Sequence, residues 1–148
     1  MVRLALAAAM TDLARASRGI RRLALLVCGG LWSAALVVTH LPRSSLRTIP
    51  ANDKVLHGVG YFVLACALAV TLLLHGHAFR RRAVAVSIAA AAYGAFDELT
   101  QPLFGRSASW GDWLADMVGA AVAVIVFEAV LSMRARRKPS AAPGPKES

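Results

Sequence analysis

Residues 55–74 read VLHGVGYFVLACALAVTLLL, a run of 20 residues without Asp, Glu, Lys or Arg. An α-helix rises 1.5 Å per residue, so about 20 apolar residues cross the hydrocarbon core of a bilayer. Backbone groups in lipid must find hydrogen-bond partners within their own segment, and the Leu, Ala and Val here favour a helix over the alternating strands of a barrel. We therefore interpret this stretch, Val55 to Leu74, as a transmembrane helix.

Three further apolar stretches of similar length accompany it: Leu23 to Leu41, Ala83 to Gln101 and Trp113 to Met133. The third spans only if its polar end approaches the membrane interface. The whole chain has 148 residues, of which 57% are apolar and 17% charged, and a mean hydropathy of +0.57. This is too apolar for a typical water-soluble domain and too short for most multidomain enzymes. The sequence predicts an all-α membrane protein, a four-transmembrane-helix bundle in contact with the lipid bilayer.

The basic residues predict the orientation of this bundle. The formal net charge is +9 and the pI about 11.1, but the Lys and Arg residues fall in short clusters between apolar runs, so nucleic acid is not an expected partner. Thirteen of the 17 precede the first span, separate the second from the third, or follow the fourth. Positively charged loops are retained in the cytoplasm, so both termini are predicted to be cytoplasmic in a multi-pass protein of the plasma (inner) membrane.

The chain therefore divides into three parts. Residues 1–22 form a basic cytoplasmic N-terminal segment, and residues 23–133 form the four-helix transmembrane domain. Residues 134–148 are basic and then rich in Pro, Ala and Ser, which is typical of a disordered cytoplasmic tail near anionic headgroups.

Polar residues recur at helical spacing near the non-cytoplasmic ends of the second, third and fourth spans. Residues four apart share one face of a helix, and charged groups facing lipid cost several kcal/mol, so these faces are expected to turn toward each other or toward a water-filled recess. The residues are Asp53, His57 and Tyr61 on the second span, Tyr93, Asp97, Glu98 and Gln101 on the third, and Asp112 and Asp116 on the fourth.

The connection between the third and fourth spans carries a single basic residue, Arg106. Pro102 discourages further helix, Gly105 can supply a turn with positive φ, and Ser109 followed by Asp112 has the spacing of a helix start. In one interpretation Arg106 and Lys54 neutralise the acids and tie the helix ends together. In the other they hold an anionic headgroup, Arg by a bidentate contact with phosphate or carboxylate.

These residues carry a resemblance to the VanZ-like family of small bacterial membrane proteins, whose founding member is linked to teicoplanin resistance. The resemblance runs from about Asp53 to Ile125. It consists of three motifs in order: Asp53-Lys54-x-x-His57-x-x-x-Tyr61, then Asp97-Glu98-x-x-Gln101, then Gly105-Arg106-Ser107 with Asp112-x-x-x-Asp116-x-x-Gly119. It implies an integral protein of the cell envelope, with a connection to glycopeptide resistance, but it implies no biochemical activity.

Three functions remain open at this point. The first is an outer-face polar pocket that binds an anionic envelope lipid or a peptidoglycan-precursor ligand. The second is an intramembrane enzyme that acts on a lipid-linked envelope precursor, with His57 or an acid as general base. The third is a structural protein whose acids and Arg106 lock the bundle while a partner protein acts. The sequence contains no recognised catalytic motif.

His57 and the acids also raise the question of a metal ion. Carboxylates and one imidazole are chemically reasonable ligands for a divalent cation, but no spacing such as H-E-x-x-H supports one. We therefore assign no metal and identify no cofactor from sequence. The ligand-binding candidates are Asp53, Lys54, His57, Tyr61, Asp97, Glu98, Gln101, Arg106, Asp112 and Asp116.

Three expectations concern residues outside this set. Arg80 to Arg82 are expected to lie in a loop between the second and third spans. His40 is expected in a solvated turn after the first span. Glu128 has no evident partner in the sequence, and is expected either to snorkel toward the cytoplasmic interface or to pair with Arg134.

Overall fold

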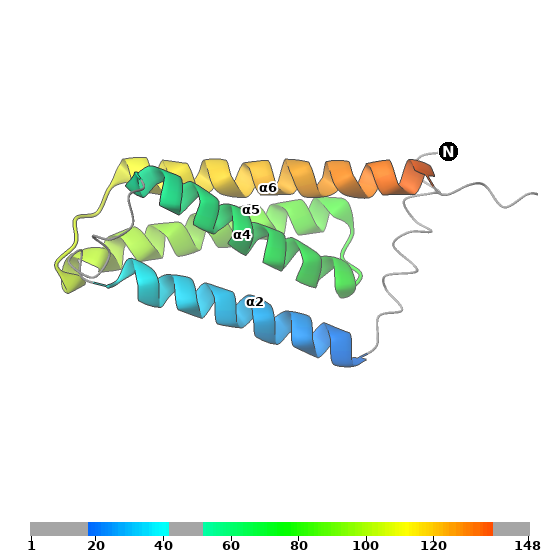
Figure 1. The fold of residues 1–148 in the computed structure, drawn as a ribbon, viewed down its shortest axis with the longest axis horizontal. Helices are drawn as coiled ribbons and strands as arrows, with labels where there is room; N and C mark the ends of the chain where they lie inside the picture. Colours follow the sequence, from blue (N-terminus) through cyan, green and yellow to red (C-terminus); the bar gives the residue numbers. More distant parts are fainter. Residues whose placement is uncertain (1–17, 42–51, 138–148) are drawn as a thin grey trace, which may run out of the picture.

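The computed structural model describes residues 18–41 and 52–137. Within these ranges the chain is helical throughout, without a strand (Figure 1). The elements are α2 (Arg18–Thr39), α4 (Asp53–Leu74), α5 (Phe79–Thr100), the short 3-10 helix η1 (Gln101–Phe104) and α6 (Trp110–Arg137). The expected N-terminal segment up to residue 17, the tail from residue 138, and Arg43 and Arg47 lie outside the described residues.

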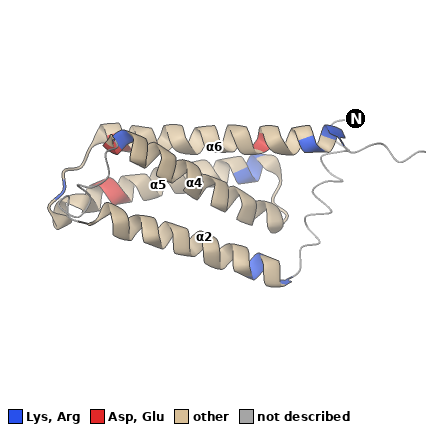
Figure 2. Cartoon of the chain, viewed as in Figure 1, with Lys and Arg blue, Asp and Glu red and all other residues tan. Residues whose placement is uncertain are grey.

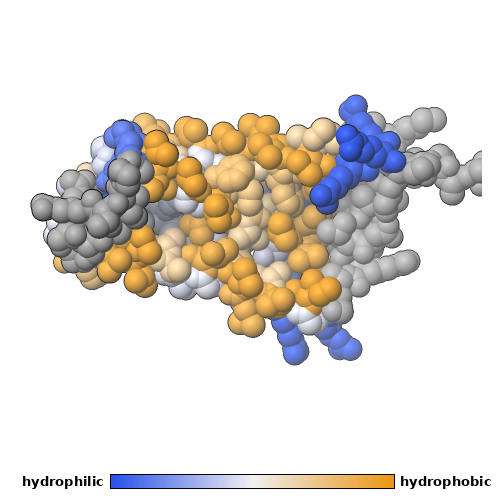
Figure 3. Space-filling model, in the orientation of Figure 1, coloured by the Kyte–Doolittle hydropathy of each residue, from blue (hydrophilic) through white to orange (hydrophobic). Residues whose placement is uncertain are grey.

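The four long helices run roughly along one axis, with α4 in its most extensive contact with α6, and α2 packed chiefly against α4 (Figure 1). Each of the four is long and apolar enough to cross a membrane. A hydrophobic band covers the middle of the molecule, and the hydrophilic surface lies toward its two ends (Figure 3). The predicted all-α, four-helix architecture is confirmed.

Local sequence signals set several of the helix ends. Asn52 caps α4 by accepting a hydrogen bond from the backbone N–H of Lys54 at 3.0 Å. After η1, Gly105 adopts a φ of 73°, a left-handed conformation that glycine adopts without steric cost. Ser109 then accepts a hydrogen bond from the N–H of Asp112 at 3.3 Å and starts α6, as its spacing predicts.

The expectation of a loop at Arg80 to Arg82 is wrong. Helix α5 begins at Phe79, so these arginines belong to its first turn, and Arg82 is only 2% exposed. Arginine is a good helix former, and the half-buried Glu128 on α6 provides a counter-charge, which removes the need for a solvated loop. The predicted pairing of Glu128 with Arg134 is replaced by this contact with Arg82.

Small residues allow α4 and α6 to approach closely. A methyl group placed on Gly119 would overlap the backbone of Gly58, so the two helices touch at these glycines. The hydrophobic core of the bundle contains few large side chains. Its members are Tyr61, Leu64, Ala65, Ala69, Val86, Ala90, Ala120 and Ala123.

Candidate functional site

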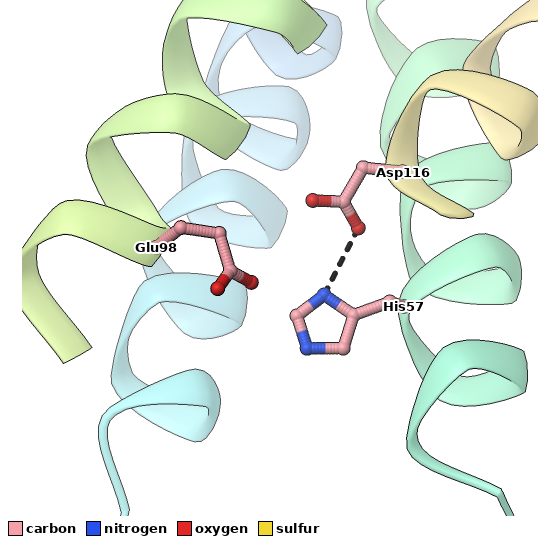
Figure 4. A group of neighbouring side chains, drawn as sticks. All are labelled: His57, Glu98 and Asp116. Atoms are coloured by element: carbon pink, nitrogen blue, oxygen red, sulfur yellow. Dashed lines mark hydrogen bonds and ion pairs between the residues drawn. The ribbon is translucent and has the colours of Figure 1, made fainter. Parts of the chain in front are cut away.

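Three ionisable side chains from three helices meet near one end of the bundle. His57 comes from α4, Glu98 from α5 and Asp116 from α6, and their exposed fractions are 7%, 6% and 0%. His57 Nδ1 lies 2.9 Å from Asp116 Oδ1, at hydrogen-bond distance (Figure 4). Each residue offers one potential ligand atom, and these three atoms lie within 4.8 Å of one another. We call these three residues the His57 cluster.

The turn between α5 and α6 holds Glu98 in place. Its Oε2 accepts a hydrogen bond from the backbone N–H of Ser109 at 2.5 Å, just before α6 begins. The contact between Gly58 and Gly119 brings α4 against α6, so that His57 and Asp116, each close in sequence to one of these glycines, reach each other. Tertiary packing therefore determines the geometry of the cluster.

Several polar atoms around the cluster are left unpaired. Among the described residues, the Tyr61 hydroxyl, Glu98 Oε1 and Asp116 Oδ2 are buried and have no hydrogen-bond partner. A methyl group placed on Gly94 would lie 3.0 Å from Asp116 Oδ2 and 3.2 Å from the Tyr61 hydroxyl, so both atoms border the same space. A buried polar atom without a partner costs about 1–3 kcal/mol, so three together are atoms that a water, an ion or a ligand group would stabilise.

Asp97 lies in a second network, and this one is closed. It is 0% exposed; its Oδ1 accepts a hydrogen bond from the Thr39 hydroxyl at 2.5 Å and its Oδ2 accepts one from Gln101 Nε2 at 3.1 Å. His40 Nδ1 lies 3.5 Å from Asp97 Oδ1. Both carboxylate oxygens are thus occupied, which indicates a role in joining α2 to α5.

The expectation of a solvated His40 is wrong, and sequence reasoning overlooked Thr39 entirely. The His40 ring is half-buried, lies 2.8 Å from the Thr100 hydroxyl and packs edge-on against Phe104 at 4.7 Å between ring centroids. The available signal was a pair of polar residues at the end of the first apolar stretch, in line with the polar ends of the other three.

The two basic candidates contact acids at the helix ends. Lys54 Nζ lies 3.6 Å from Asp112 Oδ1, and Arg106 Nη2 lies 3.5 Å from Asp53 Oδ2. The Lys54 side chain is 60% exposed, whereas that of Arg106 is 4% exposed, and Arg106 Nε has no hydrogen-bond partner among the described residues. These contacts match the charge-neutralising interpretation and leave the Arg106 guanidinium incompletely paired.

A groove of about 380 Å³ borders the cluster between α2 and α4. Apolar residues of both helices, among them Leu31, Val38 and Val59, form most of its wall. Its polar members lie toward one end and are Thr39, Asp53, His57, Tyr61 and Arg106. A smaller hollow of about 270 Å³ lies against α5 and α6, where Glu98 and two tryptophans line it.

The structure thus places all ten candidates at one end of the bundle but divides them among separate arrangements. His57, Glu98 and Asp116 form the cluster with Tyr61 beside it; Asp97 and Gln101 belong to the closed network; and Lys54, Asp112, Asp53 and Arg106 form ion pairs at the helix ends. Their binding of a ligand stays a prediction.

The fold and the buried polar groups define a class of protein: a multi-pass helical membrane protein with a polar site enclosed by three of its helices. A family model described as VanZ/LLP1 matches residues 8–131, which is most of the chain, and the protein belongs to this family. The resemblance inferred from the three motifs is confirmed. Among curated proteins and among solved structures, none matches the chain significantly.

Proposed function

We propose that the protein binds an anionic amphiphile of the cell envelope. The acyl chain would lie in the groove between α2 and α4, and the charged headgroup would lie against Arg106. One observation carries this proposal: a single groove has mostly apolar walls and includes a buried arginine, Arg106, among its few polar lining residues.

The dimensions and lining of the groove suit such a ligand. Small-molecule sites commonly measure about 300–1,000 Å³ and combine apolar walls with a few placed polar groups. The groove has a volume of about 380 Å³, and Ala34, Ala35 and Gly60 keep its wall open between larger Leu and Val side chains. A methyl group added at Gly60 would meet nothing within 4 Å, so this position offers free space for a chain.

Arg106 suits the headgroup. Its guanidinium is buried, its 3.5 Å separation from Asp53 is long for an ion pair with direct hydrogen bonding, and its Nε has no partner among the described residues. A phosphate or carboxylate can accept two parallel hydrogen bonds from Nε and one Nη, a geometry that lysine cannot supply.

The charge distribution supports an external location for this site. Apart from Lys54 and Arg106, the described basic residues gather at the opposite end of the bundle, at the start of α2, the start of α5 and the end of α6 (Figure 2). By the positive-inside rule that end faces the cytoplasm, so the groove opens toward the outer leaflet of the plasma membrane. Envelope lipids and lipid-linked peptidoglycan precursors are present on that side, which agrees with a role in teicoplanin resistance.

Lipid binding by purified protein in nanodiscs tests the proposal. We expect native mass spectrometry to show retained phosphatidylglycerol in preference to phosphatidylcholine, with retention at least about tenfold lower in Arg106→Ala, since losing charged hydrogen bonds costs about 1.5–3 kcal/mol. Arg136→Ala removes an exposed arginine at the other end of α6 and should change nothing. Gly60→Leu should reduce retention by filling the groove. Equal retention by wild type and Arg106→Ala would contradict the proposal.

A second candidate function is catalysis on a lipid-linked envelope precursor. The observation that favours it is the His57–Asp116 contact, because a carboxylate that orients an imidazole is a common arrangement for a general base. Turnover of such a lipid by purified protein, lost in both His57→Ala and Asp116→Asn, would support catalysis. Absence of product across a panel of envelope lipids, with and without divalent cations, would exclude it.

A further inference from the structure

We propose that the His57 cluster binds one divalent transition-metal ion, with Zn²⁺ or Mn²⁺ as the fitting class. The donor set consists of one imidazole and two carboxylates, each from a different helix. A metal bound here would therefore link α4, α5 and α6. Binding of the cation involves only the cluster and does not depend on lipid binding in the groove.

The separations between donor atoms suit a shared ion. Neighbouring ligands of a tetrahedral ion with bonds of about 2.0 Å lie about 3.3 Å apart. His57 Nδ1 and Asp116 Oδ1 are 2.9 Å apart, and the Glu98 carboxylate faces the same pair (Figure 4). Small side-chain movements would let an ion replace the proton between His57 and Asp116 and bring Glu98 into contact with it.

A second observation points to an occupant of this space. The Tyr61 hydroxyl is on a side chain that is 4% exposed, has no hydrogen-bond partner among the described residues, and borders the space beside Gly94 together with Asp116 Oδ2. Glu98 Oε1 is likewise buried and unpaired, while its other oxygen is held by Ser109. A metal-bound water would give the Tyr61 hydroxyl and the free carboxylate oxygen their missing partners.

The balance of charge favours a cation. Two carboxylates lie beside one imidazole in the cluster. The bases on this side, Lys54 and Arg106, contact Asp112 and Asp53 rather than the cluster. Buried carboxylates are costly in a membrane unless a positive charge compensates them, and a divalent ion would do so.

The type of donor selects the class of metal. Imidazole with carboxylates is typical of Zn²⁺, Mn²⁺ and Fe²⁺ sites, whereas Ca²⁺ and Mg²⁺ favour sets made only of oxygen ligands. Three protein ligands leave a coordination position open. Because His57 and Tyr61 also line the groove between α2 and α4, that position can receive water or an anionic group from the groove.

The direct test is the metal content of the purified full-length protein, prepared without a histidine tag in detergent. After equilibration with Zn²⁺ or Mn²⁺ and removal of free ion, we expect plasma mass spectrometry to find about one ion per chain. X-ray absorption of the zinc form should show nitrogen and oxygen neighbours at about 2.0–2.1 Å and no sulfur. The same protein equilibrated with Mg²⁺ alone should retain far less than one Mg²⁺ ion per chain.

Matched variants assign the site. Asp116→Asn and His57→Gln should each weaken binding about a hundredfold or more, because loss of an outer-shell partner of a ligand already costs about 10–100-fold. Asp112→Asn makes the same chemical change one turn earlier on α6 and should retain the ion. His75 and His77 could hold zinc adventitiously, so the double variant His75→Ala/His77→Ala serves as a control and should also retain it.

Thermal unfolding adds a readout that does not depend on metal analysis. Ligands that bind only the folded state raise its stability, so excess Zn²⁺ should raise the Tm of wild type and of Asp112→Asn but not of Asp116→Asn. Less than about one ion per ten chains in wild type with both metals would overturn the proposal. So would undiminished binding in folded Asp116→Asn, or sulfur ligation in the absorption spectrum. Lipid binding measured with and without chelator distinguishes failure of this site from failure of the groove.

Discussion

The two ends of the bundle differ in how completely their buried charged side chains are paired. Where α5 begins, Arg82 forms an ion pair with Glu128: its Nε donates to Oε1 at 2.8 Å, its Nη2 contacts the same oxygen, and its Nη1 donates to the His77 carbonyl at 2.8 Å. The Phe127 ring covers the guanidinium at 5.7 Å. Here one base meets one acid and every guanidinium nitrogen has a partner.

At the other end, the His57 cluster is incomplete. One imidazole lies among two carboxylates, and both Glu98 and Asp116 carry an oxygen without a partner among the described residues. A paired and fully hydrogen-bonded charge serves the fold, whereas an excess of buried acceptors serves it poorly and is typical of a site that receives something. The unpaired carboxylate oxygens, rather than the number of charges, are therefore the basis for placing the proposed metal site at this end.

Breaking the ion pair between Arg82 and Glu128 should have the largest effect on stability. Glu128→Leu leaves Arg82 buried without its counter-charge, and we expect a loss of about 3–5 kcal/mol in the free energy of unfolding, measured in detergent. The double variant Arg82→Met/Glu128→Leu removes both charges and should recover most of that loss. An additive result, in which the double variant is as unstable as the sum of the single ones, would show that the pair is not coupled.

Separating α4 from α6 should have the next largest effect on stability. It should act on the end that holds the His57 cluster and leave the Arg82–Glu128 pair intact. In Gly119→Ala the new methyl overlaps the Gly58 backbone, so the helices must move apart. We expect a loss of about 2–3 kcal/mol and disruption of the His57–Asp116 contact. Its control is Gly60→Ala, whose methyl meets nothing within 4 Å and which should be neutral or slightly stabilising. Equal stability of the two variants would mean that the close approach does not occur.

Hydrophobic length and polar spacing were enough to predict the four helices and the end at which the polar residues gather. The start of α5 was missed because apolar length alone cannot reveal that Glu128, 46 positions after Arg82, pairs with this buried arginine. That long-range contact lets Arg82 lie buried in the first turn of the helix, while Arg80 and Arg81 stay exposed. Local sequence does not encode it.

The sequence predicted that the ten site candidates lie at one end of the bundle, as the structure has them. It did not predict which of them contact one another. Asp97 and Glu98 are adjacent, yet helical rotation points Asp97 toward Thr39 on α2 and Glu98 toward the cluster. Spacing gives the face of a helix, whereas the identity of the facing helix depends on packing. Thr39 was overlooked and His40 was wrongly expected in a solvated turn, because the first span carried no part of the family motifs.

The closed network around Asp97 predicts an intermediate effect. Thr39→Val keeps the shape of the side chain but removes the hydroxyl that donates to Asp97 at 2.5 Å. We expect a loss of about 1–2 kcal/mol, because the carboxylate keeps Gln101 but loses a buried donor. Unfolding of Thr39→Val against the control Thr71→Val, in which the hydroxyl bonds only backbone carbonyls, measures it. A larger loss of stability in Thr71→Val than in Thr39→Val would indicate that the hydrogen bond from Thr39 does not hold Asp97 against α2.

The smallest effect on stability should come from the open end, in Asp116→Asn studied without metal. Asparagine keeps one oxygen that can accept from His57, and its amide replaces an oxygen that has no partner among the described residues with a donor. It also removes a buried negative charge next to Glu98. We therefore expect a change below about 1 kcal/mol, in contrast to the loss in Glu128→Leu, although both substitutions remove a carboxylate from α6 and Asp116 is the more deeply buried of the two. A loss in Asp116→Asn as large as that in Glu128→Leu would make the His57 cluster a structural ion pair of the same kind as the one at Arg82, because only a carboxylate that the fold does not need is free to serve a ligand.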